Sequence, residues 1–493
     1  MFGLPILSIL VALPLVGVLA LLLAEGKGEK AAQNARGIAF ASSFVTLGAA
    51  LAMLYGFDAA RPGFQYEEHV MWMPGFGVSY HMGVDGISVW LVALVTLLVP
   101  LAITASVDSI TSRVREFMIT ILLFETLVIG TFCSLDMILF YLFYEGNLIP
   151  MFVLIGTWGE GNRTRAAFKF VLFNMVGSVF FLVAILVLGA QGGTFDIPTL
   201  VKAPPTASLQ TWLWLAMFVS FAVKMPLWPV HTWLPEVHVA APTAASMLIA
   251  GLHMKLGTYG FLRILMPLLP DASDLFAPLV MVLGAITILQ NSLVAFAQTH
   301  LKRMLAYATV AHMGMTAIGA FSRTVESIQG TIMMIFVQGL VFAGLFMCVG
   351  IIHDRFKTYD TDKIAGVIAA MPKFSFIALM LILGAIALPG SGPFIAELLV
   401  LVGAYKVSTI VAIFAATAIV LAPMYFLTNY HRVIFAPNGK LAPAAGVADI
   451  SNPQVVALGV ALVIMFWLGV NPPPFLTDTA QAVTDLVATQ HIH

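Results

Sequence analysis

Two long apolar stretches of this chain are each interrupted by prolines and each carry one charged residue. The stretch 210–235 holds Lys224 beside its break, and the stretch 374–404 holds Glu397 just after its own break. Both are long enough to cross a bilayer, and a proline in such a helix frees backbone groups that need partners in protein or water. A charge at that depth costs about 3 kcal/mol on insertion scales and is typical of an ion or proton path. Corresponding broken helices in two halves of a chain also mark transporter sites. We therefore expect a membrane protein that moves charge.

The composition supports a membrane-embedded chain. Hydrophobic residues make up 60% of the 493 residues and charged residues only 10%, whereas charged residues are about 25% of an ordinary soluble domain. We expect an all-α polytopic protein without a separate soluble domain, and we interpret the first apolar segment as a retained span rather than a signal peptide. About fourteen apolar spans are expected, at 2–24, 36–57, 84–106, 114–132, 135–157, 166–190, 210–235, 241–266, 276–299, 302–321, 325–352, 374–404, 408–435 and 453–471.

The sequence lacks the usual signatures of cofactor and nucleotide sites. Its two cysteines, Cys133 and Cys348, lie at or in separate apolar spans, so they cannot form the paired motifs of iron–sulfur or zinc sites. No glycine-rich nucleotide-binding loop follows a predicted strand. We expect no cofactor and no metal in this chain, and a drive that comes from an ion gradient or from a partner.

The distribution of basic residues predicts the orientation in the membrane. The odd-numbered loops between spans hold 16 Lys and Arg residues and the even-numbered loops hold 4. Positive loops face the cytoplasm, so both termini are expected in the opposite compartment.

An internal inverted repeat is expected from the spacing of the two breaks. The seventh and twelfth spans lie five helices apart and run in opposite directions, as in inverted-repeat transporters. Helices 4–8 and 9–13 are the candidate repeats, although the two charges are not at equivalent positions. The corresponding segments are 1–110 for the first three helices, 111–270 for the first repeat, 271–436 for the second and 437–493 for the last helix and tail.

Few ionisable groups remain once loop charges are removed. They are Glu125, Glu145, Lys224, Lys255, Arg263 and Glu397, with His231, His238, His253 and His312. A buried Glu–Lys pair can act as a switch, because both groups are charged when paired and the lysine tends to release its proton when the pair separates. Histidine and water can link such pairs. We expect Glu145, Lys224, Lys255 and Glu397 to form a proton relay.

Each of these groups also has a structural interpretation. Glu145 can simply lock helix packing, Glu125 can support a neighbouring group, and His238 or His253 can be satisfied core residues. Arg263 and the basic residues near 302, at predicted helix ends, are expected to extend toward the membrane interface.

Four runs of residues resemble a known family. They are KMPLWPVHTWLPEVHVAAPTAASMLIAG (224–251), LFYEGNLIPM around Glu145, THLKRMLAYATVAHMG (299–314) and LPGSGPFIAE (388–397). Together they are similar to the antiporter-like membrane subunits of respiratory complex I, the proton-pumping NADH:quinone oxidoreductase. Glu397, where the L and N types usually have lysine, resembles the M type, whose mitochondrial counterpart is the fourth NADH dehydrogenase subunit.

The resemblance implies a fold and a set of roles. The implied fold is fourteen transmembrane helices in two inverted five-helix repeats, with the seventh and twelfth broken. Glu145 would pair with Lys224, Lys255 would be the central carrier and Glu397 the distal group. His231, His238 and His312 would line a hydrated axis, with Glu125 in support. Gln338 stands where the family commonly has a histidine, so it can hold water but cannot titrate.

The resemblance also implies partners. The chain would sit between L-type and N-type subunits, without redox chemistry of its own, while FMN, iron–sulfur clusters and quinone would lie in partner subunits.

Two other functions fit the same residues. A subunit of a multi-subunit cation/proton antiporter shares the signature around Lys224, and Glu397 argues mildly against it. A structural membrane spacer is the other alternative, because buried ion pairs can be neutral for stability. The spacer predicts that Lys224→Ala harms assembly rather than transport.

Overall fold

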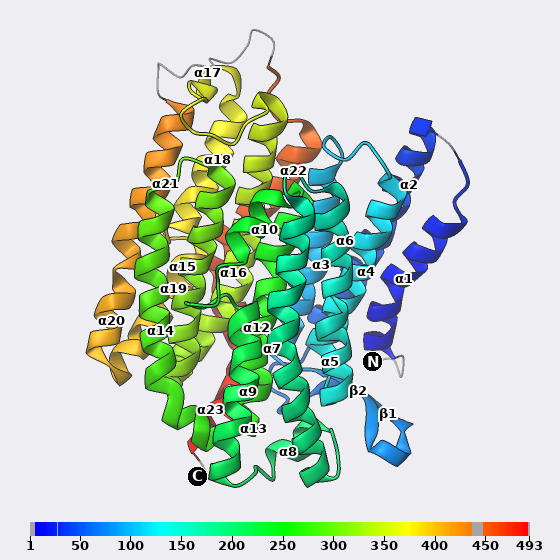
Figure 1. Ribbon diagram of the computed structural model, residues 1–493, viewed down its shortest axis with the longest axis vertical. Helices are drawn as coiled ribbons and strands as arrows, with labels where there is room; N and C mark the ends of the chain where they lie inside the picture. The colour runs from blue at the N-terminus through cyan, green and yellow to red at the C-terminus, as the bar shows by residue number, and fades with distance from the viewer. Residues whose placement is uncertain (1–4, 27, 436–446, 492–493) are drawn as a thin grey trace.

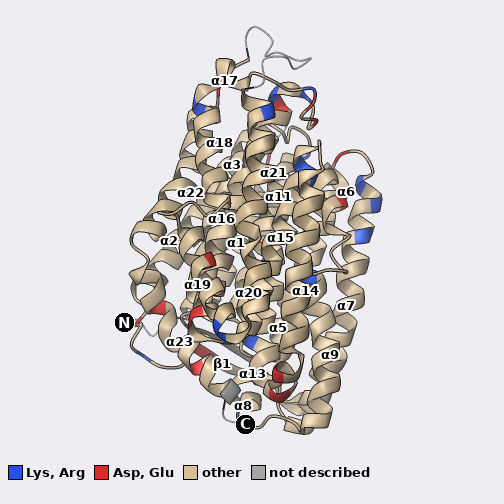
Figure 2. Ribbon diagram, turned by 90° about the vertical axis from the view of Figure 1, so that its left-hand side faces the viewer, with Lys and Arg blue, Asp and Glu red and all other residues tan. Residues whose placement is uncertain are grey.

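The protein, seen in a computed structural model, is a bundle of helices that run roughly along one axis (Figure 1). The structure describes residues 5–26, 28–435 and 447–491. A β-hairpin and the short helix α8 (Ile197–Val201) lie at one end of the bundle, and α17 (Val367–Ala370) lies at the other. Lys, Arg, Asp and Glu residues concentrate toward the two ends (Figure 2). This distribution is expected of a protein whose middle lies in hydrocarbon.

The helices occupy the places predicted from hydropathy. The N-terminal group contains α1 (Ile6–Leu23), α2 (Gly28–Tyr55), α3 (Ser88–Ser106) and α4 (Val114–Cys133). The middle group contains α5 (Met137–Gly146), α6 (Leu148–Trp158), α7 (Arg163–Gly192), α9 (Ala207–Lys224) and α10 (Leu234–Ala240). The later group contains α14 (Pro270–Phe296), α15 (Leu301–Ser322), α16 (Val325–Phe356), α18 (Pro372–Ala385), α19 (Gly392–Val407), α20 (Thr409–Ala416), α21 (Ala418–Ile434) and α22 (Asn452–Val470). By length and composition, eleven helices of the described chain can cross a membrane.

The core of the bundle is built around α16. The most apolar part of α16 is completely buried, and α15 and α3 are almost as enclosed, whereas α1 and α2 are mostly exposed. A helix that is apolar on all sides and buried on all sides is surrounded by other helices. The candidate functional residues of α15 and α16 therefore lie in the middle of the protein, away from lipid.

Both predicted helix breaks are present. The first lies between α9, which ends at Lys224, and α10, which begins at Leu234. The second lies between α18, which ends at Ala385, and α19, which begins at Gly392. Prolines at these points lack the N–H that would continue the helical hydrogen bonds. The breaks place helix ends, with their free polar groups, inside the bundle.

The span after the first break is an irregular helix. It consists of α11 (Thr243–Leu248), α12 (Met254–Gly260) and α13 (Met266–Leu268), joined by two π-helical segments, η2 (Ile249–His253) and η3 (Phe261–Leu265). A π-turn adds one residue to a helical turn and is frequent at functional sites. Gly257 lets this span approach the end of α9, since a Cβ there would lie 2.6 Å from the backbone N of Met225.

Two elements were not expected from the sequence. The segment 58–83, interpreted as a loop, contains most of an antiparallel hairpin of β1 (Gln65–Met73) and β2 (Val78–Val84). The segment after 472, interpreted as a tail, forms α23 (Pro473–His491). The alternation of apolar and polar residues is irregular in the hairpin, where register shifts interrupt the strand pairing. Helix α23 is too polar to be recognised from hydropathy. The inverted repeat and the four proposed segments remain predictions.

Candidate functional site

Glu145 and Lys224 face one another at the first break. Lys224 ends α9, and its Nζ lies 3.8 Å from Oε1 of Glu145, near the end of α5. The Lys224 Nζ also donates a 2.7 Å hydrogen bond to the backbone O of Tyr144 and lies 3.3 Å from the centroid of the Tyr144 ring. The carbonyls at a helix C-terminus lack helical partners and carry partial negative charge. The Lys224 amine therefore contacts one carboxylate and neutral acceptors. It keeps a hydrogen-bond partner when Glu145 and Lys224 move apart.

Lys255 is buried, and no carboxylate of the described residues pairs with it. It lies on α12 between the two π-segments, 1% exposed, and its Nζ is 3.7 Å from Sδ of Met313 on α15. A thioether sulfur is a weak acceptor. An isolated buried ammonium is costly, so the site favours an amine that gives up its proton readily.

In the region around the second break, His312 contacts two other polar groups. His312 of α15 is hydrogen-bonded through Nδ1 to Nε2 of Gln338 on α16, at 2.8 Å. The same Nδ1 lies 3.5 Å from Oε1 of Glu397 on α19. His312 and Glu397 are both nearly inaccessible. Met313, which Lys255 contacts, follows His312 directly on α15, so Lys255 and this group contact the same turn of α15.

The remaining histidines are distributed around the first break. His231 lies within the break and His238 on α10, and both are buried with unpartnered ring nitrogens: Nδ1 for His231, and both Nδ1 and Nε2 for His238. His253 of η2 makes a 2.8 Å hydrogen bond between its Nδ1 and Oδ1 of Asn147. Asn147 joins α5 to α6, and its amide donates to the Tyr144 O that also accepts from Lys224. Asn147 was not predicted from the sequence, although its place two residues after Glu145 was a usable signal.

Glu125 is not brought to the other groups. It is fully buried on α4, and within the described chain both of its carboxylate oxygens lack a hydrogen-bond partner. An ionised carboxylate in this setting would be costly. The structure therefore places Glu125 apart from the contacts of Glu145 and Lys224.

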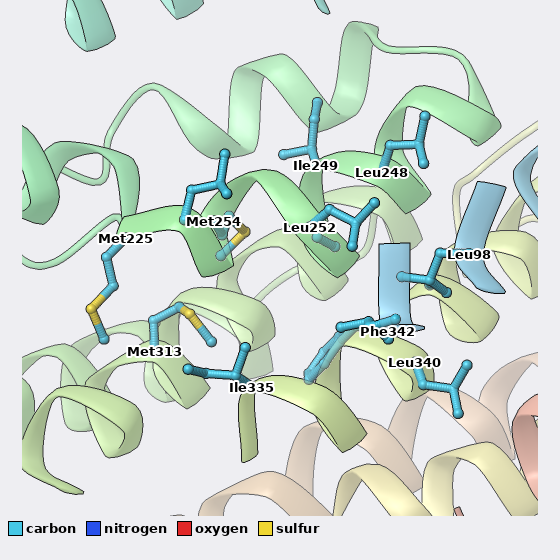
Figure 3. Packing of buried hydrophobic residues seen from close by; sticks show 14 of the residues in the cluster. Leu98, Met225, Leu248, Ile249, Leu252, Met254, Met313, Ile335, Leu340 and Phe342 are labelled. Atoms are coloured by element: carbon cyan, nitrogen blue, oxygen red, sulfur yellow. The ribbon is translucent and has the colours of Figure 1, made fainter. Parts of the chain in front are cut away.

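Apolar side chains fill the space around the charged groups. Met225, Met254 and Met313 directly follow or precede relay residues in sequence, and Figure 3 shows them packed with Ile335 and Phe342 among the buried hydrophobic residues. Low polarity strengthens electrostatic interactions between the few ionisable groups. A change of charge at one group is then felt by the next.

Two basic residues differ from expectation. Arg263 does not extend to the interface: it is buried, and its guanidinium contacts Oδ1 of Asp85 at 2.5 Å and the Tyr259 hydroxyl at 3.1 Å. The carboxylate of Asp85, far away in sequence, supplies the pairing that the arginine would otherwise find in water. Lys302 is also buried, and its Nζ donates to the backbone O of Ala241 at 2.7 Å. Both residues lie near predicted helix ends, so their burial was not expected from the sequence.

Comparison with known proteins now identifies the family. Residues 134–422 match the family described as NADH:quinone oxidoreductase/Mrp antiporter, transmembrane region, and residues 63–131 match the amino terminus of NADH-ubiquinone oxidoreductase chain 4. NADH-quinone oxidoreductase subunit M of Rhodobacter capsulatus is 39% identical, over 99% of this chain and 97% of its own length. NADH-ubiquinone oxidoreductase chain 4 of Marchantia polymorpha is 40% identical, over 98% of this chain and 97% of its own.

Solved structures agree with this. A chain of respiratory complex I from Thermus thermophilus with bound NADH has a TM-score of 0.90 and 29% identity, covering 98% of this chain and 99% of that chain. A chain of the Mrp complex from Dietzia has a TM-score of 0.84 at 19% identity over 98% of this chain and 99% of its own, a likeness of fold alone. The predicted resemblance and the polytopic all-α fold are confirmed. The chain belongs to the NADH:quinone oxidoreductase/Mrp antiporter family, as an antiporter-like membrane-arm subunit of the subunit M and chain 4 group of respiratory complex I.

Proposed function

We propose that this subunit translocates protons through a relay that runs from Glu145 and Lys224, by way of Lys255, to His312 and Glu397. The observation that carries the proposal is the pairing at the first break. Lys224 has one carboxylate at 3.8 Å and a neutral carbonyl at 2.7 Å. When Glu145 moves away or becomes neutral, the buried lysine loses its counter-charge and tends to release its proton.

The next acceptor in this scheme is Lys255. Its contact with Met313 at 3.7 Å leaves its amine without a competing charge, so it can take up a proton and release it again. His312, one residue from Met313, contacts both Gln338 and Glu397. Protonation of one member of such a chain alters the proton affinity of its neighbours, which lets a change at Glu145 reach Glu397.

Gln338 has a passive part in this relay. Its amide holds His312 in place at 2.8 Å, and an amide neither gains nor loses a proton near neutral pH. Of these two residues, His312 alone titrates. His231 and His238 line the path with unpartnered ring nitrogens, and Glu125 is a supporting group outside it.

The drive for this relay comes from outside the chain. Moving one charge against 100 mV costs about 2.3 kcal/mol. In this proposal the redox groups, FMN, iron–sulfur clusters and quinone, belong to partner subunits, and this chain performs no electron transfer. L-type and N-type antiporter-like subunits are the proposed neighbours in a bacterial inner membrane, with both termini of this chain on the periplasmic side.

The test is NADH-driven proton uptake by inverted membrane vesicles that carry Glu145→Gln. A native gel and NADH oxidation with an artificial acceptor show whether the complex is assembled. We expect normal assembly with proton uptake and coupled quinone reduction lowered about tenfold or more, since a positioned proton carrier contributes factors of this order.

Glu116→Gln is the matched control, because Glu116 lies on the first turn of α4 with its side chain 43% exposed. It should leave proton uptake unchanged. Normal uptake in Glu145→Gln would refute the relay, and loss of assembly in Lys224→Ala with normal uptake per assembled complex would favour a structural spacer. NADH-independent, sodium-dependent proton exchange would favour a cation/proton antiporter.

A further inference from the structure

A polar cavity opens near the relay at the end of the bundle opposite the β-hairpin. Its volume is about 510 Å³, and its lining includes Glu160, Arg165, Glu236, Arg303 and Tyr359. The loops at this end are those predicted to be cytoplasmic from their basic residues. The cavity is wide enough for many water molecules and lined by enough polar groups to hold them.

Lys302 lies directly behind the wall of this cavity. Tyr359 lines the cavity, and Nζ of Lys302 is 4.6 Å from the centroid of the Tyr359 ring. Lys302 is 1% exposed, and its Nζ donates a hydrogen bond to the neutral backbone O of Ala241, at 2.7 Å. A second link to the cavity runs through His353, whose ring stacks on Tyr359 at 4.1 Å and whose Nδ1 is 3.9 Å from Oε1 of Glu160.

The charged and titratable groups near Lys302 come from several elements. Glu160, between α6 and α7, and Asp354, on α16, act electrostatically on its amine from the cavity side. On the inner side Lys302 acts electrostatically on His238 of α10, and α10 packs on α15. Lys302 therefore lies between water-accessible carboxylates and a buried histidine.

His238 has the features of a proton acceptor, and no hydrogen bond of its ring in the described chain gives it a structural role. It is completely buried, and in the described part of the chain both of its ring nitrogens lack a hydrogen-bond partner. A buried imidazole with no partner costs stability, and the His238 ring stacks on Phe346, with 4.3 Å between centroids. Phe342, one turn earlier on α16, contacts His312 at 5.1 Å. The two phenylalanines thus connect the surroundings of His238 with the relay.

We propose that Lys302 and His238 form the proton-uptake site of this subunit. Water in the cavity delivers a proton to the neutral amine of Lys302, and the resulting ammonium passes a proton to an unprotonated ring nitrogen of His238. Lys302 is then neutral again and takes its next proton from the cavity, while the imidazolium of His238 releases the proton of its other ring nitrogen toward the relay through intervening water. This inference rests on the proposed function, because the relay from Lys224 to Glu397 is what the site supplies.

A structural role for Lys302 makes a different prediction. Ala241 is the residue at the C-terminal end of α10, and a cation there stabilises the helix through its partial negative charge. Arginine would keep that hydrogen bond and that charge, but arginine does not release its proton in proteins. Lys302→Arg consequently separates a helix cap from a proton carrier.

The experiment compares NADH-driven proton uptake, per assembled complex, in vesicles with Lys302→Arg, Lys302→Met and His238→Gln. We expect about a tenfold loss of uptake in all three, and the double variant Lys302→Arg/His238→Gln should lose no more than a single one, because both act on one path. Lys363→Met is the matched control, since Lys363 lies between α16 and α17 outside the cavity lining, with its side chain 58% exposed, and it should pump normally.

Normal pumping in Lys302→Arg together with loss in Lys302→Met would make Lys302 a helix cap and overturn the proposal. If Lys302→Arg fails to assemble, His238→Gln decides, and its normal pumping overturns the uptake site. Loss of uptake in Glu145→Gln with normal uptake in Lys302→Arg and His238→Gln would leave the relay intact and remove only the uptake site.

Discussion

The ammonium of Lys255 rests against the sulfur of Met313, 3.7 Å away, rather than against a carboxylate. The middle of the proposed relay therefore differs from its two sides, where a carboxylate lies close to the basic group. Lys224 at one side has Glu145 within 3.8 Å, and His312 at the other has Glu397 within 3.5 Å.

This contrast predicts the effect of adding a carboxylate. Met313→Glu should trap the proton on Lys255, because an opposite charge nearby stabilises the ammonium by about 1–4 kcal/mol. Proton uptake by vesicles should fall about 10- to 1000-fold at normal assembly. Met313→Leu, which conserves volume and apolar character, is the control and should pump close to normally. Equal pumping by both variants would show that Lys255 does not exchange its proton.

Gln338 offers a test of how His312 is held. Gln338→Leu removes the amide that donates to Nδ1 of His312, and an unsatisfied buried partner costs about 1–3 kcal/mol. We expect a several-fold loss of proton uptake. Gln338→His should pump at least as well as the native chain, since an imidazole also reaches His312 and adds a titratable group. Loss of pumping in Gln338→His, with assembly intact, would mean that the relay needs a group that cannot titrate here.

We expect that the loss of either Arg263 or Asp85 alone destabilises the protein more than the loss of both. Asp85→Asn keeps an oxygen for the N–H groups of Ile87 and Ser88 at the start of α3 but leaves Arg263 without its counter-charge. Removing one member of a buried pair costs about 3–5 kcal/mol. Heat inactivation of the assembled complex should therefore occur at a clearly lower temperature. The double variant Asp85→Leu/Arg263→Met should recover much of the loss; a double variant as unstable as Asp85→Asn would contradict this account.

The contact between the β-hairpin and the rest of the protein should contribute to stability in a pH-dependent way. Nδ1 of His81 on β2 lies 2.6 Å from Oδ1 of Asp196, at the start of α8. Burial alone would lower the pKa of His81, but the hydrogen bond and charge of Asp196, with help from Glu67, raise it above its usual value. Burial tends to raise the pKa of Asp196, but the hydrogen bond and charge of His81 together with the hydrogen bonds from Thr199 outweigh it, so that pKa is lowered.

The sign of the pH dependence follows from these two directions. The stabilisation from His81 is complete below its usual pKa of about 6.5 and is lost as the pH rises through the raised value, and that from Asp196 is lost only as the pH falls through a value below about 3.9. Heat stability of the complex should fall as the pH rises from about 6.5 through the raised pKa of His81, and His81→Gln should flatten this slope. An unchanged slope in His81→Gln would assign the dependence to other groups.

The sequence was most informative where a residue type restricts the backbone, as proline does when it ends a helix. Pro226 and Pro389 cannot continue a helix, so both breaks were predictable, and the depth of Glu145, Lys224 and Glu397 followed from hydropathy. Which of these groups touch was not predictable, because it depends on how helices distant in sequence pack. The pair of Arg263 with Asp85 joins residues 178 positions apart, and no local pattern reports such a pairing.

Other residues were missed because hydropathy is averaged over a window of neighbouring residues. Lys302 sits at the first turn of α15, where a hydropathy window sees mainly the polar loop before it, yet Ala241 and Tyr359 enclose it. Asn147 is neutral and therefore escaped a search for charges, although its amide joins Lys224's acceptor to His253.

The two π-segments on either side of Lys255 have a consequence for its orientation. Each adds a residue to a turn, so η2 and η3 shift the face that carries Lys255 relative to the faces of α11 and α13. A helical wheel drawn at 3.6 residues per turn across 243–268 therefore assigns Lys255 to the wrong side with respect to one flank or the other. The orientation of the Lys255 amine thus depends on both π-turns, because an α-turn in place of either one would rotate the amine by about 100° relative to that flank.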